Sequence, residues 1–180
     1  EGVVIQNPEW MSVGNDVWID KYCNLLAGPV DLEGKIVKRR ENKSFKWEVG
    51  ELIIGNNIHI GAFAILQANG GLCIGNNVTT SAAVKIYSLS NYPHNEDNPN
   101  IITYANCMVK DEPVSYIISP IIIENGVWIA LNSIILGGTI GENSFITSNS
   151  IVINDIPPNS HASGSPAKRI KERFKMGKNN

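Results

Sequence analysis

The chain lacks the features that mark several large classes of protein. It has only three cysteines, Cys23, Cys73 and Cys107, an odd number at wide spacing, which argues against a disulfide framework and a cysteine knuckle for a metal. No apolar run approaches the roughly 20 residues that a membrane-spanning helix needs. No charged and then apolar stretch typical of a secretion signal opens the sequence. We therefore expect a cytoplasmic protein with reduced thiols.

An excess of one charge is also missing. The 15 basic and 17 acidic side chains give a formal charge of −2, and the estimated isoelectric point is 5.9. Proteins that bind nucleic acid or anionic membranes normally carry a concentrated basic field. The composition therefore argues against both kinds of partner.

Leucine is scarce, with 9 residues against 26 isoleucines. β-Branched side chains lose rotamer freedom in helices but fit the pleated surface of a sheet. The ratio indicates an all-β protein with little helix, and 180 residues suffice for a single domain with its own core.

One short phrase recurs along the chain. Its first position is an aliphatic residue and its second is usually Gly. The third is Asn or an acidic residue, the fourth is a small polar residue or Gly, and the fifth is usually aliphatic. The five copies are 13–17, 54–58, 74–78, 123–127 and 140–144. Such self-similarity is the signature of a repeat architecture.

From each copy an aliphatic residue tends to return at every sixth position. The positions are Val13, Ile19, Leu25; Ile54, Ile60, Leu66; Ile74, Thr80, Ile86; Ile123, Ile129, Ile135; and Ile140, Ile146, Val152. A period of six fits neither an amphipathic helix nor an ordinary half-buried strand. It predicts a solenoid in which each unit is a short strand and a turn, three units close one triangular coil, and the aliphatic residues point inward.

The phrases near the carboxy terminus carry a family resemblance. Residues 123–130, 134–141, 156–159 and 164–168 resemble, in order and spacing, the carboxy-terminal half of the hexapeptide-repeat acyltransferases, and in particular the maltose, galactoside and xenobiotic O-acetyltransferase branch. The resemblance implies a left-handed parallel β-helix, a homotrimer with active sites between subunits, and acetyl-CoA as the acyl donor.

Two stretches interrupt the repeats and a third follows them. We expect coils at about 13–30, 53–87 and 121–157, insertions at 31–51 and 88–120, and a short C-terminal helix at 167–175 that caps the solenoid. The first insertion is rich in lysine and arginine; it is either a solvated loop or hairpin, or a patch for the acceptor or for CoA phosphates. The resembled family has a loop over its active site at the place of the second insertion.

Acetyl transfer to a hydroxyl needs a base within hydrogen-bond reach, and histidine suits that task at neutral pH. Of the three histidines, His59 lies within a repeat and His161 lies in the turn before the final phrase. His94 lies in the second insertion and is the predicted catalytic base. By family register the residue before Pro93 is Tyr92, so His94 falls two positions late, and a protein without a histidine base is the alternative.

The resemblance also implies which residues meet the donor and the acceptor. The predicted contacts for acetyl-CoA are Ala130, Leu131, Ser148, Asn149, Ile153 and Asn154, with Lys168 and Lys171 toward its phosphates. The predicted substrate-binding residues are Asn69, Tyr92 and Trp128. No metal is expected.

These features predict an acetyl-CoA-dependent O-acetyltransferase that acts on a sugar or saccharide hydroxyl, as in surface polysaccharide biosynthesis. A non-catalytic β-helix, serving as a scaffold or as a CoA-binding protein, is the alternative that the displaced histidine leaves open, and an amine acceptor is another. A γ-class carbonic anhydrase shares the solenoid but needs three histidines around zinc, and the three histidines here do not cluster in the sequence.

Overall fold

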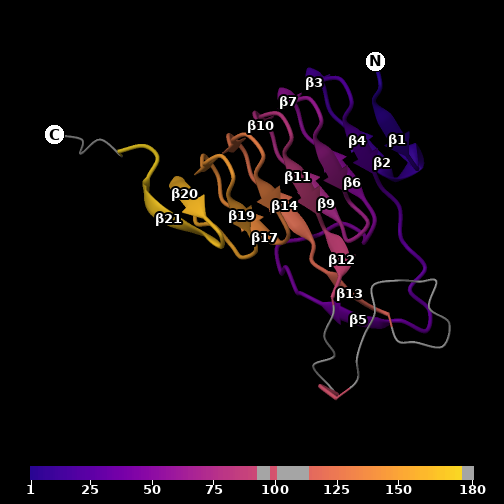
Figure 1. Cartoon of the computed structure of the whole chain (residues 1–180). Helices are drawn as coiled ribbons and strands as arrows, with labels where there is room; N and C mark the ends of the chain where they lie inside the picture. Colours follow the sequence, from indigo (N-terminus) through magenta and orange to yellow (C-terminus); the bar gives the residue numbers. More distant parts are fainter. Residues whose placement is uncertain (93–97, 101–113, 176–180) are drawn as a thin grey trace.

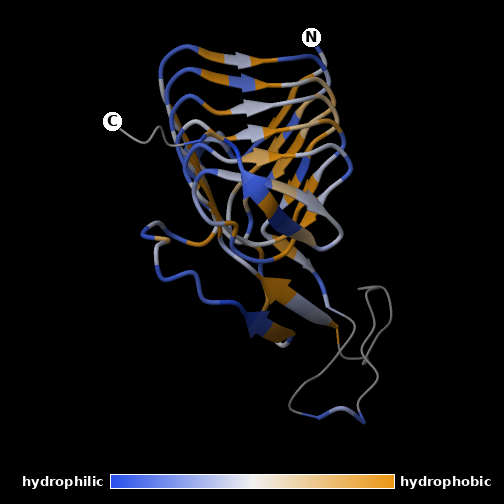
Figure 2. Cartoon of the chain, turned by 90° about the vertical axis from the view of Figure 1, so that its left-hand side faces the viewer, coloured by the Kyte–Doolittle hydropathy of each residue, from blue (hydrophilic) through white to orange (hydrophobic). Residues whose placement is uncertain are grey.

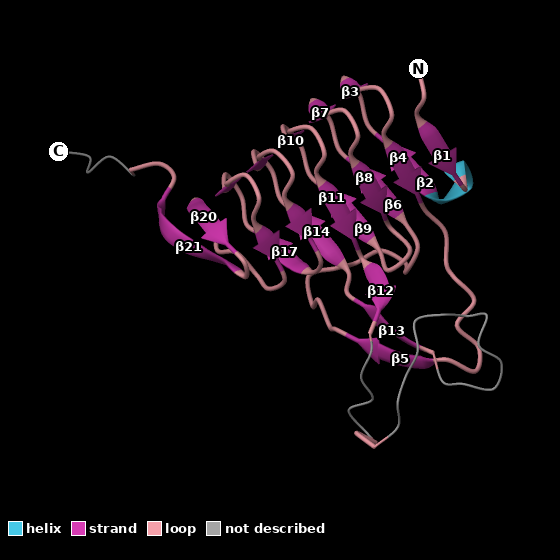
Figure 3. Ribbon diagram, in the orientation of Figure 1, coloured by secondary structure: helices cyan, strands magenta, loops and turns pink. Residues whose placement is uncertain are grey.

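Three parallel sheets wind into a triangular prism in the computed structural model, which describes residues 1–92, 98–100 and 114–175 (Figure 1). Within these residues the one helical element is the short turn Pro8–Trp10 (Figure 3). No described helix has the length and apolar character needed to cross a membrane. The prediction of an all-β left-handed parallel β-helix is confirmed.

The coils contribute one short strand to each sheet, with exceptions at the end of the solenoid. Sheet A consists of β1 (Val4–Gln6), β4 (Asn24–Leu26), β8 (Ile65–Gln67), β11 (Lys85–Tyr87), β16 (Ile134–Ile135) and β19 (Ile151–Val152). Sheet B consists of β2 (Met11–Val13), β6 (Leu52–Ile54), β9 (Leu72–Ile74), β14 (Ile121–Ile123) and β17 (Gly138–Ile140). Sheet C consists of β3 (Val17–Ile19), β7 (Ile58–Ile60), β10 (Thr79–Thr80), β15 (Trp128–Ile129), β18 (Phe145–Ile146), β20 (Ser160–Gly164) and β21 (Ala167–Glu172). The last coil meets sheet B only through the bridge between Ile156 and Ile140, and β21 is added to sheet C by a hairpin.

The aliphatic residues with period six form the core. Hydrophobic strands stack through the prism (Figure 2), and each inward side chain lies on its equivalent in the next coil. In sheet A this column is Leu25, Leu66, Ile86, Ile135 and Val152, each at most 1% exposed. The predicted inward positions are confirmed except in the first coil, where Ile19 is only half-buried and Val13 is 50% exposed. Sheet B ends there, at β2, within the described residues.

The recurring Gly-Asn-Asn phrase is explained by the corner between sheets B and C. The Oδ1 atom of Asn76 accepts the backbone N–H of Asn56 at 2.8 Å, and Asn125 does the same for Asn76 at 2.7 Å. The second residue, as in Asn57 with φ 56°, takes the left-handed conformation that asparagine tolerates. A Cβ on Gly55 would lie 2.7 Å from Asn76 Oδ1, so glycine leaves room for this ladder.

A small fourth sheet joins the two insertions. It contains β5 (Ile36–Arg39), β12 (Leu89–Asn91) and β13 (Ser115–Ile118), in the order β12-β13-β5. Strand β5 from the first insertion runs parallel to β13 from the second, with Arg39 opposite Ile118. Figure 1 shows these three strands projecting from one side of the prism. The two insertions therefore form one unit.

The predicted C-terminal helix at 167–175 is wrong. Residues Ala167–Glu172 form strand β21, which pairs antiparallel with β20 at the end of sheet C. The charged sequence is compatible with a helix, but helix propensity is a weak preference that tertiary context overrides. The exposed edge of β20 offers unpaired backbone groups, and β21 satisfies them as the second strand of a hairpin.

Candidate functional site

Four of the predicted donor contacts meet at the corner between sheets C and A. Ala130 and Leu131 follow β15, and Ser148 and Asn149 follow β18 in the next coil. The N–H of Asn149 donates to the carbonyl of Leu131 at 3.0 Å. Ala130 is buried, whereas the other three residues are exposed. We call these four residues the donor corner.

The two predicted phosphate-binding lysines lie beyond the donor corner. Lys168 and Lys171 are exposed on β21, with Lys168 opposite Ser163 in the hairpin. The hydroxyl of Thr147 donates to Ser163 Oγ at 2.8 Å, and Thr147 directly precedes Ser148 of the donor corner. Lys168 is therefore connected to that corner through its strand partner Ser163 and the hydrogen bond from Thr147 to Ser163.

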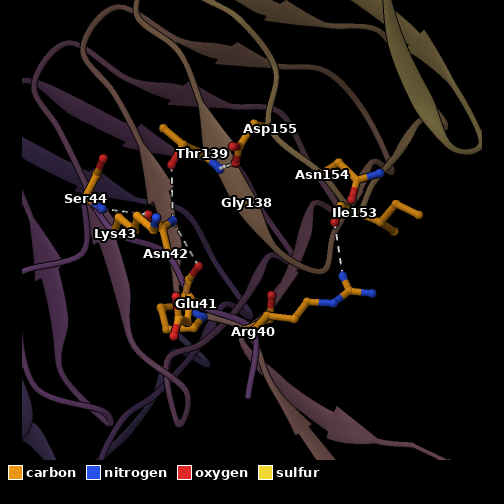
Figure 4. A pocket seen from close by; sticks show the side chains of 12 residues that line it. Arg40, Glu41, Asn42, Lys43, Ser44, Gly138, Thr139, Ile153, Asn154 and Asp155 are labelled. Carbon is orange, nitrogen blue, oxygen red and sulfur yellow. Dashed lines mark hydrogen bonds between the residues drawn. The ribbon is translucent and has the colours of Figure 1, made fainter. Parts of the chain in front are cut away.

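Ile153 and Asn154 directly follow β19, at the corner between sheets A and B. They border a cavity of about 660 Å³ (Figure 4). That volume is within the usual range of small-molecule sites. We call it the insertion cavity. It is lined by residues 40–44 of the first insertion, by Ser119 and Pro120, and by residues 138, 139 and 153–155 of the last coils.

The sequence offered the first insertion as a patch for the acceptor or for CoA phosphates, but it did not predict that this insertion and the last coils enclose a cavity. The run of cations in the first insertion was the one available signal, and it gave no indication of which part of the solenoid the run meets. The pairing of β5 with β13 decides this, because it places Arg40 so that its guanidinium donates to the carbonyl of Ile153 at 3.1 Å, 113 residues away.

Asn69 and Tyr92 lie on the side of the solenoid that carries the insertions. Asn69, half-buried after β8, donates its side-chain N–H to the carbonyl of Gly28 at 2.8 Å and so holds two coils together. Gln67 of the same coil accepts the N–H of Leu89 at 3.1 Å, which anchors β12. Tyr92 follows β12, and its ring lies 5.0 Å from the ammonium of Lys38.

Trp128 lies on a different face from these two residues. It points outward from sheet C, 45% exposed, and its indole N–H donates to Ser81 Oγ at 3.3 Å. Its ring packs on Phe145 at 5.0 Å between centroids. Trp128 is two residues before Ala130. Within one chain it therefore lies near the donor corner and not near Asn69 and Tyr92.

The predicted catalytic residue His94 lies outside the described residues. The two other histidines both point outward from sheet C, His59 on β7 and His161 on β20. Four pairing steps of the sheet separate them. The described residues contain no group of three or more His, Cys, Asp or Glu side chains that could hold a metal.

His59 and Asp20 form a hydrogen bond, with Nε2 of His59 3.1 Å from Oδ2 of Asp20. The hydrogen bond from the indole of Trp18 and then that from His59 lower the pKa of Asp20. In contrast, burial on the outer side of sheet B raises the pKa of the Cys73 thiol to about 11. Cys73 is therefore protonated at neutral pH and a poor nucleophile.

Comparison with known proteins found relatives in sequence and in fold, although no family model matches the chain. Galactoside O-acetyltransferase of Escherichia coli strain K12 is 36% identical over 126 residues, which is 66% of this chain and 55% of that enzyme. The chain spans about half the length of that relative. A second relative, from Saccharomyces cerevisiae, is also named as an acetyltransferase. It is 32% identical over 122 residues, which is 67% of this chain and 56% of that protein.

Solved structures share the fold. A mutant of AntD, an N-acyltransferase from Bacillus cereus in complex with dTDP and coenzyme A, has a TM-score of 0.73 at 22% identity, covering 97% of this chain and 80% of that one. A hexapeptide-repeat acetyltransferase of Vibrio cholerae complexed with acetyl coenzyme A has a TM-score of 0.53 at 21% identity, covering 97% and 72%.

Proposed function

The chain belongs to the hexapeptide-repeat acyltransferases, and on that premise we propose that it transfers the acetyl group of acetyl-CoA to a hydroxyl of a sugar or saccharide. The observation that carries the proposal is the donor corner, where Ala130, Leu131, Ser148 and Asn149 from two consecutive coils lie side by side. The similarity to a galactoside O-acetyltransferase supports the choice of a hydroxyl acceptor. We expect the reaction in the cytoplasm, on a precursor of a surface polysaccharide.

The proposed reaction needs one proton transfer out and one back. In this scheme His94 takes the proton of the acceptor hydroxyl while the oxygen attacks the thioester carbonyl. The new C–O ester bond forms, the C–S bond breaks, and the proton returns to the sulfur of CoA. The backbone groups of the donor corner would hold the pantetheine arm, and Lys168 and Lys171 would meet the phosphates.

We expect the double variant Lys168→Ala/Lys171→Ala to bind acetyl-CoA about tenfold more weakly, because charge-assisted hydrogen bonds to phosphate are lost. Calorimetric titration measures this directly. The variant Lys21→Ala/Lys35→Ala, which removes two exposed lysines far from the hairpin, serves as the charge-matched control. Equal affinity in the two variants would reject the assignment of the lysines, and no binding to the unmodified protein would favour the scaffold alternative.

We propose that the outer surface of sheet A packs against another copy of the chain in a homotrimer. Its outward side chains include six aliphatic residues that are half-buried even in the single chain, Leu26, Ile65, Ile134, Leu136, Ile151 and Ile153, together with Asn24, Gln67, Lys85 and Tyr87. At β16 and β19 the sheet is aliphatic on both faces, which is typical of a sheet buried on both. Since the donor corner borders sheet A, this packing would place the active sites between subunits.

Placing a charge on this surface tests the assembly. We expect Ile134→Glu/Ile151→Glu to dissociate the trimer, because two carboxylates cannot be buried without partners. Sedimentation velocity measures the change in mass, and Ser12→Glu, at an exposed outward position of sheet B, is the control. A variant that keeps the mass of the unmodified protein would contradict the proposed interface.

A further inference from the structure

The first insertion carries a concentrated positive charge. Between Lys35 and Lys46 there are six lysine and arginine residues and one carboxylate, Glu41. Two of the cations, Arg40 and Lys43, line the insertion cavity. Figure 4 shows the guanidinium of Arg40 on one side of the cavity and Lys43 on the other.

Hydrogen bonds hold this cationic segment over the last coils. The backbone N–H of Arg40 donates to the carbonyl of Ile118 at 2.8 Å, which extends the pairing of β5 with β13 by one residue. Two residues later, Asn42 donates its side-chain N–H groups to the carbonyl of Pro120 at 3.3 Å and to Thr139 Oγ1 at 3.1 Å. The segment is therefore positioned before any ligand arrives.

The two cations keep most of their binding capacity. A guanidinium has five N–H donors, and that of Arg40 spends one on the carbonyl of Ile153. Within the described part of the chain, neither Arg40 nor Lys43 has a carboxylate within 4.0 Å, although Glu41 and Asp155 also line the cavity. The carboxylate of Asp155 instead accepts the N–H of Thr139 at 2.7 Å.

We propose that Arg40 and Lys43 form a subsite for a phosphate group of the acceptor, so that the acceptor is a sugar phosphate or a nucleoside diphosphate sugar. This deepens the proposed function and rests on it. The planar fork of arginine binds two phosphate oxygens at once, and lysine adds a point charge. The hydroxyls of Ser44 and Thr139 line the same cavity and can bind the sugar.

The position of the cavity assigns this phosphate to the acceptor. Lys168 and Lys171, the lysines proposed for CoA phosphates, lie on the hairpin of sheet C. The insertion cavity lies at the corner between sheets A and B, on the side of the prism that carries the paired strands β5 and β13. Because Ile153 and Asn154, two of the predicted acetyl-CoA contacts, also line this cavity, a phosphate of CoA is the competing source, and the experiment separates the two.

Calorimetric titration at fixed ionic strength tests the subsite with four probes: inorganic pyrophosphate, uridine diphosphate glucose, methyl α-D-glucoside and CoA. The double variant Arg40→Gln/Lys43→Gln is compared with Lys35→Gln/Lys46→Gln, which removes the same charge from exposed positions outside the cavity. We expect the first variant to weaken binding of pyrophosphate and uridine diphosphate glucose at least tenfold and to leave CoA unchanged. The second variant should change each affinity less than twofold.

Other outcomes overturn the proposal. A loss of CoA affinity in Arg40→Gln/Lys43→Gln would assign the cavity to the donor. Methyl α-D-glucoside binding as tightly as uridine diphosphate glucose, or no binding of pyrophosphate, would exclude a phosphate subsite. Equal losses in the two variants would indicate a diffuse field without a site. The titration of the unmodified protein with acetyl-CoA reports on the proposed function separately, so the two failures are distinguishable.

Discussion

Replacing His94 by alanine is expected to lower the rate of acetyl transfer by a factor of about 10² to 10⁴, the usual contribution of a general base. A sugar hydroxyl is a poor nucleophile until its proton leaves, and His94 is the proposed acceptor of that proton. The initial rate of CoA release with a saturating sugar acceptor measures the effect. Acetyl-CoA affinity should stay unchanged, because His94 is not among the residues proposed to hold the donor.

The control for this experiment is His59→Ala. His59 is an exposed histidine paired with Asp20 on sheet C, so its loss removes an imidazole without touching the proposed base. We expect transfer by the control to stay within twofold of the unmodified protein. If His94→Ala keeps its activity and His59→Ala loses it, the assignment is wrong and the His59–Asp20 pair becomes the base. If both variants keep activity, a mechanism without a histidine base is required.

Replacing Ile60 by alanine is expected to reduce the free energy of unfolding by about 2 to 5 kcal/mol, as for other large-to-small changes in a core. Ile60 is completely buried. It lies between Ile19 and Thr80 of the adjacent coils. Because the paired strands hold these neighbours in place, they cannot move inward to fill the cavity that the substitution leaves. Equilibrium unfolding in urea measures the loss.

The adjacent residue provides the matched control for stability. His59→Ala changes an outward position of the same strand, and the exposed contact between His59 and Asp20 is expected to contribute at most about 1 kcal/mol. A loss in His59→Ala as large as that in Ile60→Ala would contradict the inward and outward alternation on β7. Because a trimer would couple unfolding to dissociation, both variants need to be compared at one protein concentration.

The repeat made the fold predictable from the sequence. A period of six fixes which residues point inward, and the same pattern recurs in each coil, so one correct register gives the whole core. Thr80 illustrates this, since the period alone placed a polar residue inward and the structure buries it completely. Its hydroxyl can remain there because it accepts the N–H of Gly61 at 3.3 Å.

The candidate site was predictable only where it lies within the repeats. The family resemblance implied the residues of the donor corner, and coil spacing explains why they are adjacent, because residues one coil apart, such as Leu131 and Asn149, stack. Asn69 is different: the resemblance proposes it for the acceptor, and the structure shows its side-chain N–H bonded to the carbonyl of Gly28, which the sequence did not indicate. The predicted base, His94, lies outside the described residues.

The sequence by itself determined the solenoid, its inward residues and the corners, because these depend on contacts between neighbouring coils that repeat along the chain. The tertiary structure decided the features that depend on single, distant pairings. The β5–β13 pairing carries Arg40 to Ile153, 113 residues away, and creates the insertion cavity. The exposed edge of β20 turns Ala167–Glu172 into a strand despite its helix-compatible composition. Neither pairing belongs to the six-residue repeat, so no repeating pattern in the sequence predicts it.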